Sequence, residues 1–151
     1  MVLLLCMGCT QGTVFHSFKH VDLKGWSKYD TLRFEVPAGQ MPASAAVEIE
    51  LRRNNSYPYR QLWLAVSYRL TSGKWECDTI ECTLYDKEGR PLGGTAGSLY
   101  QTSHPFKALA RPLTGPLEIK VSPAMRDLVI YGICDVGVKL EYSARHQSSA
   151  E

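Results

Sequence analysis

Few side chains in this sequence have a type and spacing that could do chemistry. The five cysteines and four histidines are scattered, and neither a Gly-x-Ser-x-Gly elbow nor a His-Glu-x-x-His motif occurs. His16 and His20 would share one face of a strand or a helix, but the residues around them supply no set of carboxylate or thiol ligands. Catalytic residues, a metal site and a cofactor are therefore not predicted, and the sequence favours a protein that is not an enzyme.

Cys9 has a candidate role in lipid attachment. Residues 1–7 form an apolar run, and Gly8 and Cys9 follow it as the small residue and cysteine that end a lipoprotein signal. In that chemistry the thiol is acylated and the cysteine becomes the new N-terminus. Because no Lys or Arg precedes the run, we expect the natural leader to extend upstream with positive charges. On these residues alone, an apolar terminus without structure explains the stretch equally well.

Two further cysteines, Cys82 and Cys134, alternate with apolar residues within 80–84 and 134–138 and are predicted to face the core. They could form a disulfide if their strands are neighbours, because export would permit one. Two buried free thiols are the favoured interpretation, since an odd number of cysteines indicates no disulfide framework.

Length and charge place limits on the class of protein. A chain of 151 residues is long enough for one domain with a core of its own. Hydrophobic residues make up 44% and charged residues 21%, which is typical of a globular protein. A formal charge of +2 is too small to predict nucleic acid as a partner. No apolar run reaches the roughly 18 residues that a membrane-spanning helix needs.

The dominant pattern beyond residue 12 is the two-residue alternation of strands. One segment, 61–70, is apolar on both faces between Leu62 and Val66, which predicts a central strand covered on both sides. The glycine-rich residues 90–98 are predicted as a loop. We expect an all-β fold, a single antiparallel β-sandwich or jelly roll of about eight strands over residues 12–143, followed by a flexible tail, 144–151. The strand-like segments are 13–21, 31–37, 45–53, 61–70, 78–86, 116–123 and 134–142.

Aromatic residues beside the predicted loops suggest a surface for recognition. Tyr57 and Tyr59 flank Pro58, which would hold both rings on a stiff turn, and Trp75 lies in another loop. Flat rings bury a large area at a small cost in entropy, so these three are candidates for an interaction surface. For Trp26 and Trp63, packing over the sandwich is favoured.

Several stretches together resemble one known family. They are GWSKYDTLRFEVP, LRRNNSYPYRQLWLAVSY, DTIECTLYDKEGRPLGGTAGSLY and AMRDLVIYGICDVGVKLEY, which cover most of residues 22–142. In order and approximate spacing they are similar to the gliding-motility lipoprotein GldH family of Bacteroidetes. The most specific pieces are residues 57–59 together with residues 62–64, the turn region 86–97 and residues 135–137.

The resemblance implies an exported protein with a signal peptide, 1–9, and a lipid such as palmitate on Cys9. It implies a non-enzymatic scaffold or interaction module of the gliding-motility and type IX secretion class, whose partners are other envelope proteins. Because the residues after Cys9 lack an acidic cluster, we expect an outer-membrane anchor that faces the periplasm. A carbohydrate-binding module of the envelope is the alternative function.

Two Asp-Thr-apolar triplets resemble the sites that these bacteria O-glycosylate, and they make Thr31 and Thr79 candidates for that modification. Both triplets also begin predicted strands, and entry into a strand is the favoured explanation.

Overall fold

The computed structural model describes residues 12–40, 44–70, 73–109 and 115–143. Strands dominate these residues, and none of them forms a helix long and apolar enough to cross a membrane. The elements are β1 (Thr13–His20), β2 (Trp26–Ser27), β3 (Leu32–Val36), the 3-10 turn η1 (Ala38–Gln40), β4 (Ala45–Arg53), β5 (Gln61–Leu70), β6 (Glu76–Thr83), β7 (Gly94–Ala96), β8 (Leu99–Leu109), β9 (Leu117–Pro123), β10 (Val129–Ile130) and β11 (Ile133–Tyr142).

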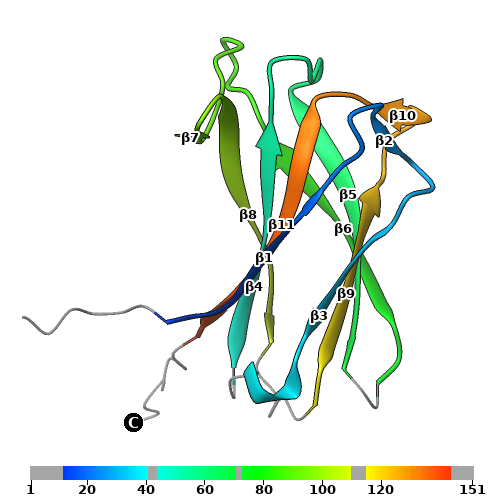
Figure 1. Ribbon diagram of the computed structural model, residues 1–151, viewed down its shortest axis with the longest axis vertical. Helices are drawn as coiled ribbons and strands as arrows, with labels where there is room; N and C mark the ends of the chain where they lie inside the picture. Colours follow the sequence, from blue (N-terminus) through cyan, green and yellow to red (C-terminus); the bar gives the residue numbers. More distant parts are fainter. Residues whose placement is uncertain (1–11, 41–43, 71–72, 110–114, 144–151) are drawn as a thin grey trace, which may run out of the picture.

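Two antiparallel sheets pack face to face (Figure 1). The five-stranded sheet has the order β1-β11-β4-β8-β7, and the four-stranded sheet has the order β3-β9-β5-β6. A two-stranded ladder of β2 and β10 lies at one end of the sandwich. The predicted all-β antiparallel sandwich is confirmed.

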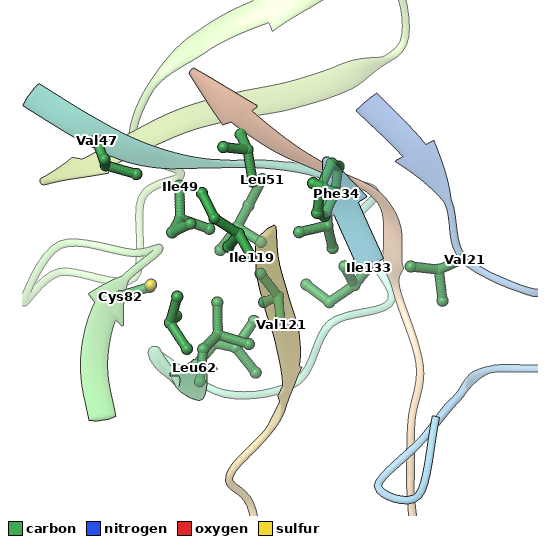
Figure 2. Packing of buried hydrophobic residues seen from close by; sticks show 14 of the residues in the cluster. Val21, Phe34, Val47, Ile49, Leu51, Leu62, Cys82, Ile119, Val121 and Ile133 are labelled. Atoms are coloured by element: carbon green, nitrogen blue, oxygen red, sulfur yellow. The ribbon is translucent and has the colours of Figure 1, made fainter. Parts of the chain in front are cut away.

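The core lies between the sheets and follows the alternation in the sequence. Val47, Ile49 and Leu51 of β4 are buried, as are Ile119 and Val121 of β9 on the facing sheet. Figure 2 shows these side chains pointing into one shared space. Removing each such side chain from water contributes roughly 1.5–3 kcal/mol, so the alternating positions supply much of the driving force for folding.

The sequence pattern gave no strand prediction for residues 99–109, where β8 forms. Pro105 interrupts the pattern there, and a proline in a paired strand normally removes a ladder hydrogen bond. The structure accommodates it at a bulge, where the register between β4 and β8 shifts at Val47 and Glu48. The predicted loop over residues 90–98 contains the short strand β7, which pairs with the start of β8.

Candidate functional site

In the turn between β4 and β5, the two tyrosines that flank Pro58 have different environments. Tyr57 is only 2% exposed, and its hydroxyl donates a hydrogen bond to the Gln61 carbonyl oxygen at 2.6 Å. Burial raises the pKa of Tyr57. Tyr59 is 41% exposed. The prediction that both rings lie at the surface is therefore wrong for Tyr57, which packs in the core and leaves Tyr59 as the surface residue.

A chain of hydrogen bonds holds this turn on the sandwich. The buried guanidinium of Arg53 donates to the Tyr85 hydroxyl at 3.0 Å and to the Leu84 carbonyl at 2.9 Å. The Tyr85 hydroxyl donates in turn to the Tyr57 carbonyl at 3.0 Å. Arg53 also stacks on the Tyr85 ring, with 4.0 Å between its Cζ and the ring centroid. Because these groups are tied to β4 and to the segment after β6, Tyr59 projects from a fixed base.

Tyr59 and Trp63 line one groove of about 470 Å³ on the outer side of β5, here called the Trp63 groove. The loop after β9 forms the other wall with Met125, Arg126 and Asp127. The Tyr59 hydroxyl donates to Asp127 Oδ2 at 2.6 Å, and this bond raises the pKa of Tyr59. The groove thus offers two aromatic faces beside a guanidinium and a carboxylate, a combination suited to binding rather than to bond cleavage.

Exposure of Trp63 differs from the prediction for its strand. The apolar run from Leu62 to Val66 predicts a strand covered on both sides, and Leu62, Leu64 and Val66 are indeed buried. Trp63 points to the other face and is 40% exposed. A period-two pattern indicates which residues share a face, but only the assembled sheets decide whether a second layer covers that face.

Trp75 lies apart from Tyr59. It is half-buried, and its ring contacts the Lys120 ammonium at 3.8 Å and the Arg69 guanidinium at 4.7 Å from the centroid. Trp75 lines a second cavity, along the edges of β1 and β3. The three aromatic residues predicted as one interaction surface therefore have three different environments.

The outer face of the five-stranded sheet holds charges that the linear sequence did not bring together. His16 contacts the buried carboxylate of Glu50, and His20 contacts that of Asp135. Lys139 lies on the same face and forms ion pairs there, including one with Glu48 at 3.0 Å. No group of three or more metal-binding side chains occurs in the part of the chain that the structure describes. We interpret the face as a layer of paired charges.

The remaining predicted site residues fall in separate places. Thr31 is exposed just before β3, and Thr79 is exposed on the edge strand β6; their glycosylation stays a prediction. Cys9 and the tail 144–151 lie outside the described residues.

Cys82 and Cys134 are both free thiols, and they lie in different sheets. Cys82 points into the core from β6 (Figure 2). Cys134 is only half-buried because the register of β11 against β4 shifts between Ile133 and Asp135, so it occupies a bulge. The condition for a disulfide, neighbouring strands, is not met, and the prediction that Cys134 faces the core is wrong.

Alkylation of the native protein tests this assignment. Burial raises the pKa of the Cys82 thiol to about 12, so almost no thiolate forms at pH 8. We expect iodoacetamide to modify the exposed Cys77 in the folded protein and to modify Cys82 only after denaturation. Peptide mass spectrometry reads the sites separately. A linked Cys82–Cys134 peptide in the unreduced protein would contradict the assignment.

Fold and surface together define an all-β sandwich with two surface cavities. The sequence profile of a family described as GldH lipoprotein matches residues 13–140. The chain belongs to the GldH lipoprotein family, as the resemblance predicted.

Two curated relatives support this membership. The chain is 25% identical over 145 residues to the gliding motility lipoprotein GldH of Flavobacterium johnsoniae, covering 91% of this chain and 90% of the relative. It is 24% identical over 149 residues to the gliding motility lipoprotein GldH homolog of Christiangramia forsetii, covering 93% and 91%. A solved structure of infectious bursal disease virus, Gx strain, covers 90% of this chain and 32% of its own at 14% identity, but its TM-score of 0.28 carries no argument. Membership of a lipoprotein family supports a membrane-anchored place in the cell envelope.

Proposed function

We propose that this protein is a lipid-anchored component of the gliding-motility system that acts by binding a partner and not by catalysis. The observation that carries the proposal is the Trp63 groove, in which Trp63 and Tyr59 stand exposed on the sandwich beside Arg126 and Asp127. The names of the two relatives support the place in gliding motility. More specifically, we propose a role alongside the type IX secretion system.

Strand pairing supports an anchor at one end and a groove near the other. Cys9 precedes Thr13 by four residues, which span at most about 14 Å. Thr13 pairs with Glu141, which pairs with Ala46 at the start of β4. Tyr59 follows the far end of β4, so the groove lies roughly 23 Å further along the strands. Acylation of Cys9 would hold the start of β1 near the bilayer and leave the groove accessible from the envelope space.

The periplasmic face of the outer membrane is the location we propose. The residues that follow Cys9, Thr10 to Phe15, contain no acidic side chain. This composition supports retention on the periplasmic side, because the family resemblance implies that an acidic cluster after the acylated cysteine directs such lipoproteins to the cell exterior.

Carbohydrate binding is the second candidate function, and a specific observation favours it. Aromatic rings can stack against the apolar face of a sugar, while Arg126 and Asp127 in the same groove could hydrogen-bond its hydroxyls. A protein segment would use the same rings as apolar anchors. The two candidates therefore share a site and differ in the ligand.

Truncation of the two exposed rings tests the proposal. Cross-linking in the envelope identifies candidate partners. We expect Trp63→Ala to weaken binding of such a partner about 30-fold, equivalent to roughly 2 kcal/mol, and Tyr59→Ala to weaken it less. The control is Tyr142→Ala, which removes a still more exposed ring, 61% exposed, from β11 outside the groove. Affinity is measured on purified partner candidates by titration calorimetry.

A parallel titration with soluble oligosaccharides separates the alternative. Saturable sugar binding that Trp63→Ala abolishes would favour the carbohydrate function over the protein partner. Unchanged binding of every ligand by Trp63→Ala and Tyr59→Ala would exclude the groove as the functional surface.

A further inference from the structure

A second cavity, of about 570 Å³, runs along the open side of the sandwich between β1 and β3. It is called the seam here. β1 is an edge strand of the five-stranded sheet and β3 is an edge strand of the four-stranded sheet. The two strands contact each other, so both open edges lie on the same side of the molecule.

Lys19 marks the edge of the covered core on β1. Lys19 pairs with Val136, and Val136 pairs with Leu51, so the three lie in one row across the sheet. Val136 and Leu51 are fully buried, whereas Lys19 is exposed. All three side chains point to the same face, and the Lys19 ammonium lies 5.7 Å from the centroid of the Phe34 ring of β3. The facing sheet therefore reaches Lys19 with β3, and among the described residues no further strand of that sheet lies beyond β3.

The seam spans the two open edges. It is lined by Phe15, Ser17 and Lys19 of β1 and by Arg33, Phe34 and Glu35 of β3. In the described residues β3 pairs with β9 alone, so its other edge presents backbone groups to an added strand.

The seam carries more positive than negative charge. Arg33 lies directly opposite Lys120 in the ladder, and like charges in that position repel. Among the described residues, neither these two side chains nor Lys19 makes an ion pair with a carboxylate. Glu118, which also lines the seam, is engaged by Arg69 at 3.1 Å. Glu35 is the other carboxylate of the cavity, so three cations exceed the one uncommitted anion.

Aromatic side chains complete the cavity. Phe15 and Phe34 line its inner side, and the Trp75 ring contacts the Lys120 ammonium at 3.8 Å. An added strand would therefore meet apolar rings with one set of alternate side chains and cations with the other.

We propose that the seam binds an extended acidic segment of a partner protein, which adds to the edge of β3 as a fifth strand of that sheet. Backbone pairing would supply affinity, and acidic side chains on its outer face would neutralise Arg33 and Lys120. Apolar side chains on its inner face would cover the half-buried ring of Phe15. This site is separate from the Trp63 groove and goes beyond the function proposed for it.

Three capped peptides of about nine residues test the proposal by titration calorimetry. The first alternates Glu with Val, and the second alternates Lys with Val. The third alternates Glu with Pro, which has the same charge but lacks an N–H at every second residue and holds φ near −65°, away from the geometry of a paired strand. We expect saturable binding of the first peptide only, weakened by salt because its charges are exposed. Equal binding of the Glu/Pro peptide would indicate an anion site without strand addition. No binding of the Glu/Val peptide, or equal binding of the Lys/Val peptide, would also overturn the proposal.

Charge reversal in the seam supplies the matched variants. We expect Arg33→Glu to weaken binding of the Glu/Val peptide at least tenfold without lowering the melting temperature, because it places opposite charges across the ladder from Lys120. Lys87→Glu, in the exposed turn after β6, is the control and should bind like the wild type. Unchanged binding by Arg33→Glu would overturn the proposed site.

The two sites can fail independently. The Trp63→Ala variant should bind the Glu/Val peptide with unchanged affinity. The Arg33→Glu variant should likewise bind any ligand of the Trp63 groove as the wild type does. Competition by inorganic phosphate at equal concentration, or self-association of the protein that Arg33→Glu abolishes, would assign the seam to a different occupant and contradict the proposal.

Discussion

Replacing Gly132 with alanine is expected to lower the free energy of unfolding by roughly 3 kcal/mol or more. Gly132 has a φ of 92°, where a side chain costs about 1–2 kcal/mol. A Cβ there would also lie 2.3 Å from the backbone nitrogen of Tyr57 and 2.7 Å from its Cα. Backbone atoms cannot rotate away, so the whole turn that carries Tyr59 must shift.

Gly89→Ala is the matched control for Gly132→Ala. Gly89 has a φ of 80°, but a Cβ there meets no atom within 4 Å. The Gly89→Ala substitution should therefore lower the free energy of unfolding only through backbone strain at positive φ, by about 1 kcal/mol. Thermal unfolding should show a fall in melting temperature of about 6–12 °C for Gly132→Ala and of a few degrees for Gly89→Ala. Equal losses would show that the close approach of residue 132 to Tyr57 contributes nothing.

The Gly132 substitution also links the fold to the Trp63 groove. Because the clash acts on the turn 54–60, ligand binding in the groove should weaken in protein that is still folded. The Gly89→Ala variant should bind normally, since its turn, between β6 and β7, lies outside the groove.

Replacing Cys9 with serine is expected to release the natural protein from the membrane. Each buried methylene of an acyl chain contributes about 0.8 kcal/mol, and two chains give a stable anchor where one gives only marginal binding. We expect the wild type to enter the detergent phase in a phase-partition experiment and to carry fatty acid at Cys9. The Cys9→Ser variant should stay in the aqueous phase.

Cys6→Ser is the control for the anchor, because it changes the other cysteine of the same segment. It should leave partitioning unchanged. A wild-type protein found wholly in the aqueous phase, without fatty acid, would contradict the proposed anchor and leave both binding sites to be tested separately.

Much of the fold could be predicted because a half-buried strand has a local signature. Val47, Ile49 and Leu51 alternate with polar residues, and all three are buried in β4. The strand β8 could not be predicted in the same way. Its Pro105 argues against a strand until the bulge opposite β4 is known, and a bulge depends on the partner strand.

The candidate site was predictable only in part. Tyr57 and Tyr59 are equivalent in the sequence, yet one is buried and the other lines a groove. The contacts of His16 with Glu50 and of His20 with Asp135 join residues that are 34 and 115 positions apart. No local pattern carries such pairings, because they arise from the order of strands in the sheet.

Residue types and their order thus determined the all-β class and the alternating core positions, since these depend on neighbours within a few residues. They also determined the family resemblance, which depends on the order of several stretches along the chain. The tertiary structure alone decided that Trp63 stays exposed, that Cys134 occupies a bulge and that the open edges of β1 and β3 lie beside one cavity. The physical reason is that exposure and edge position depend on how the strands are ordered and how the two sheets are placed against each other, and residues distant in the chain determine both.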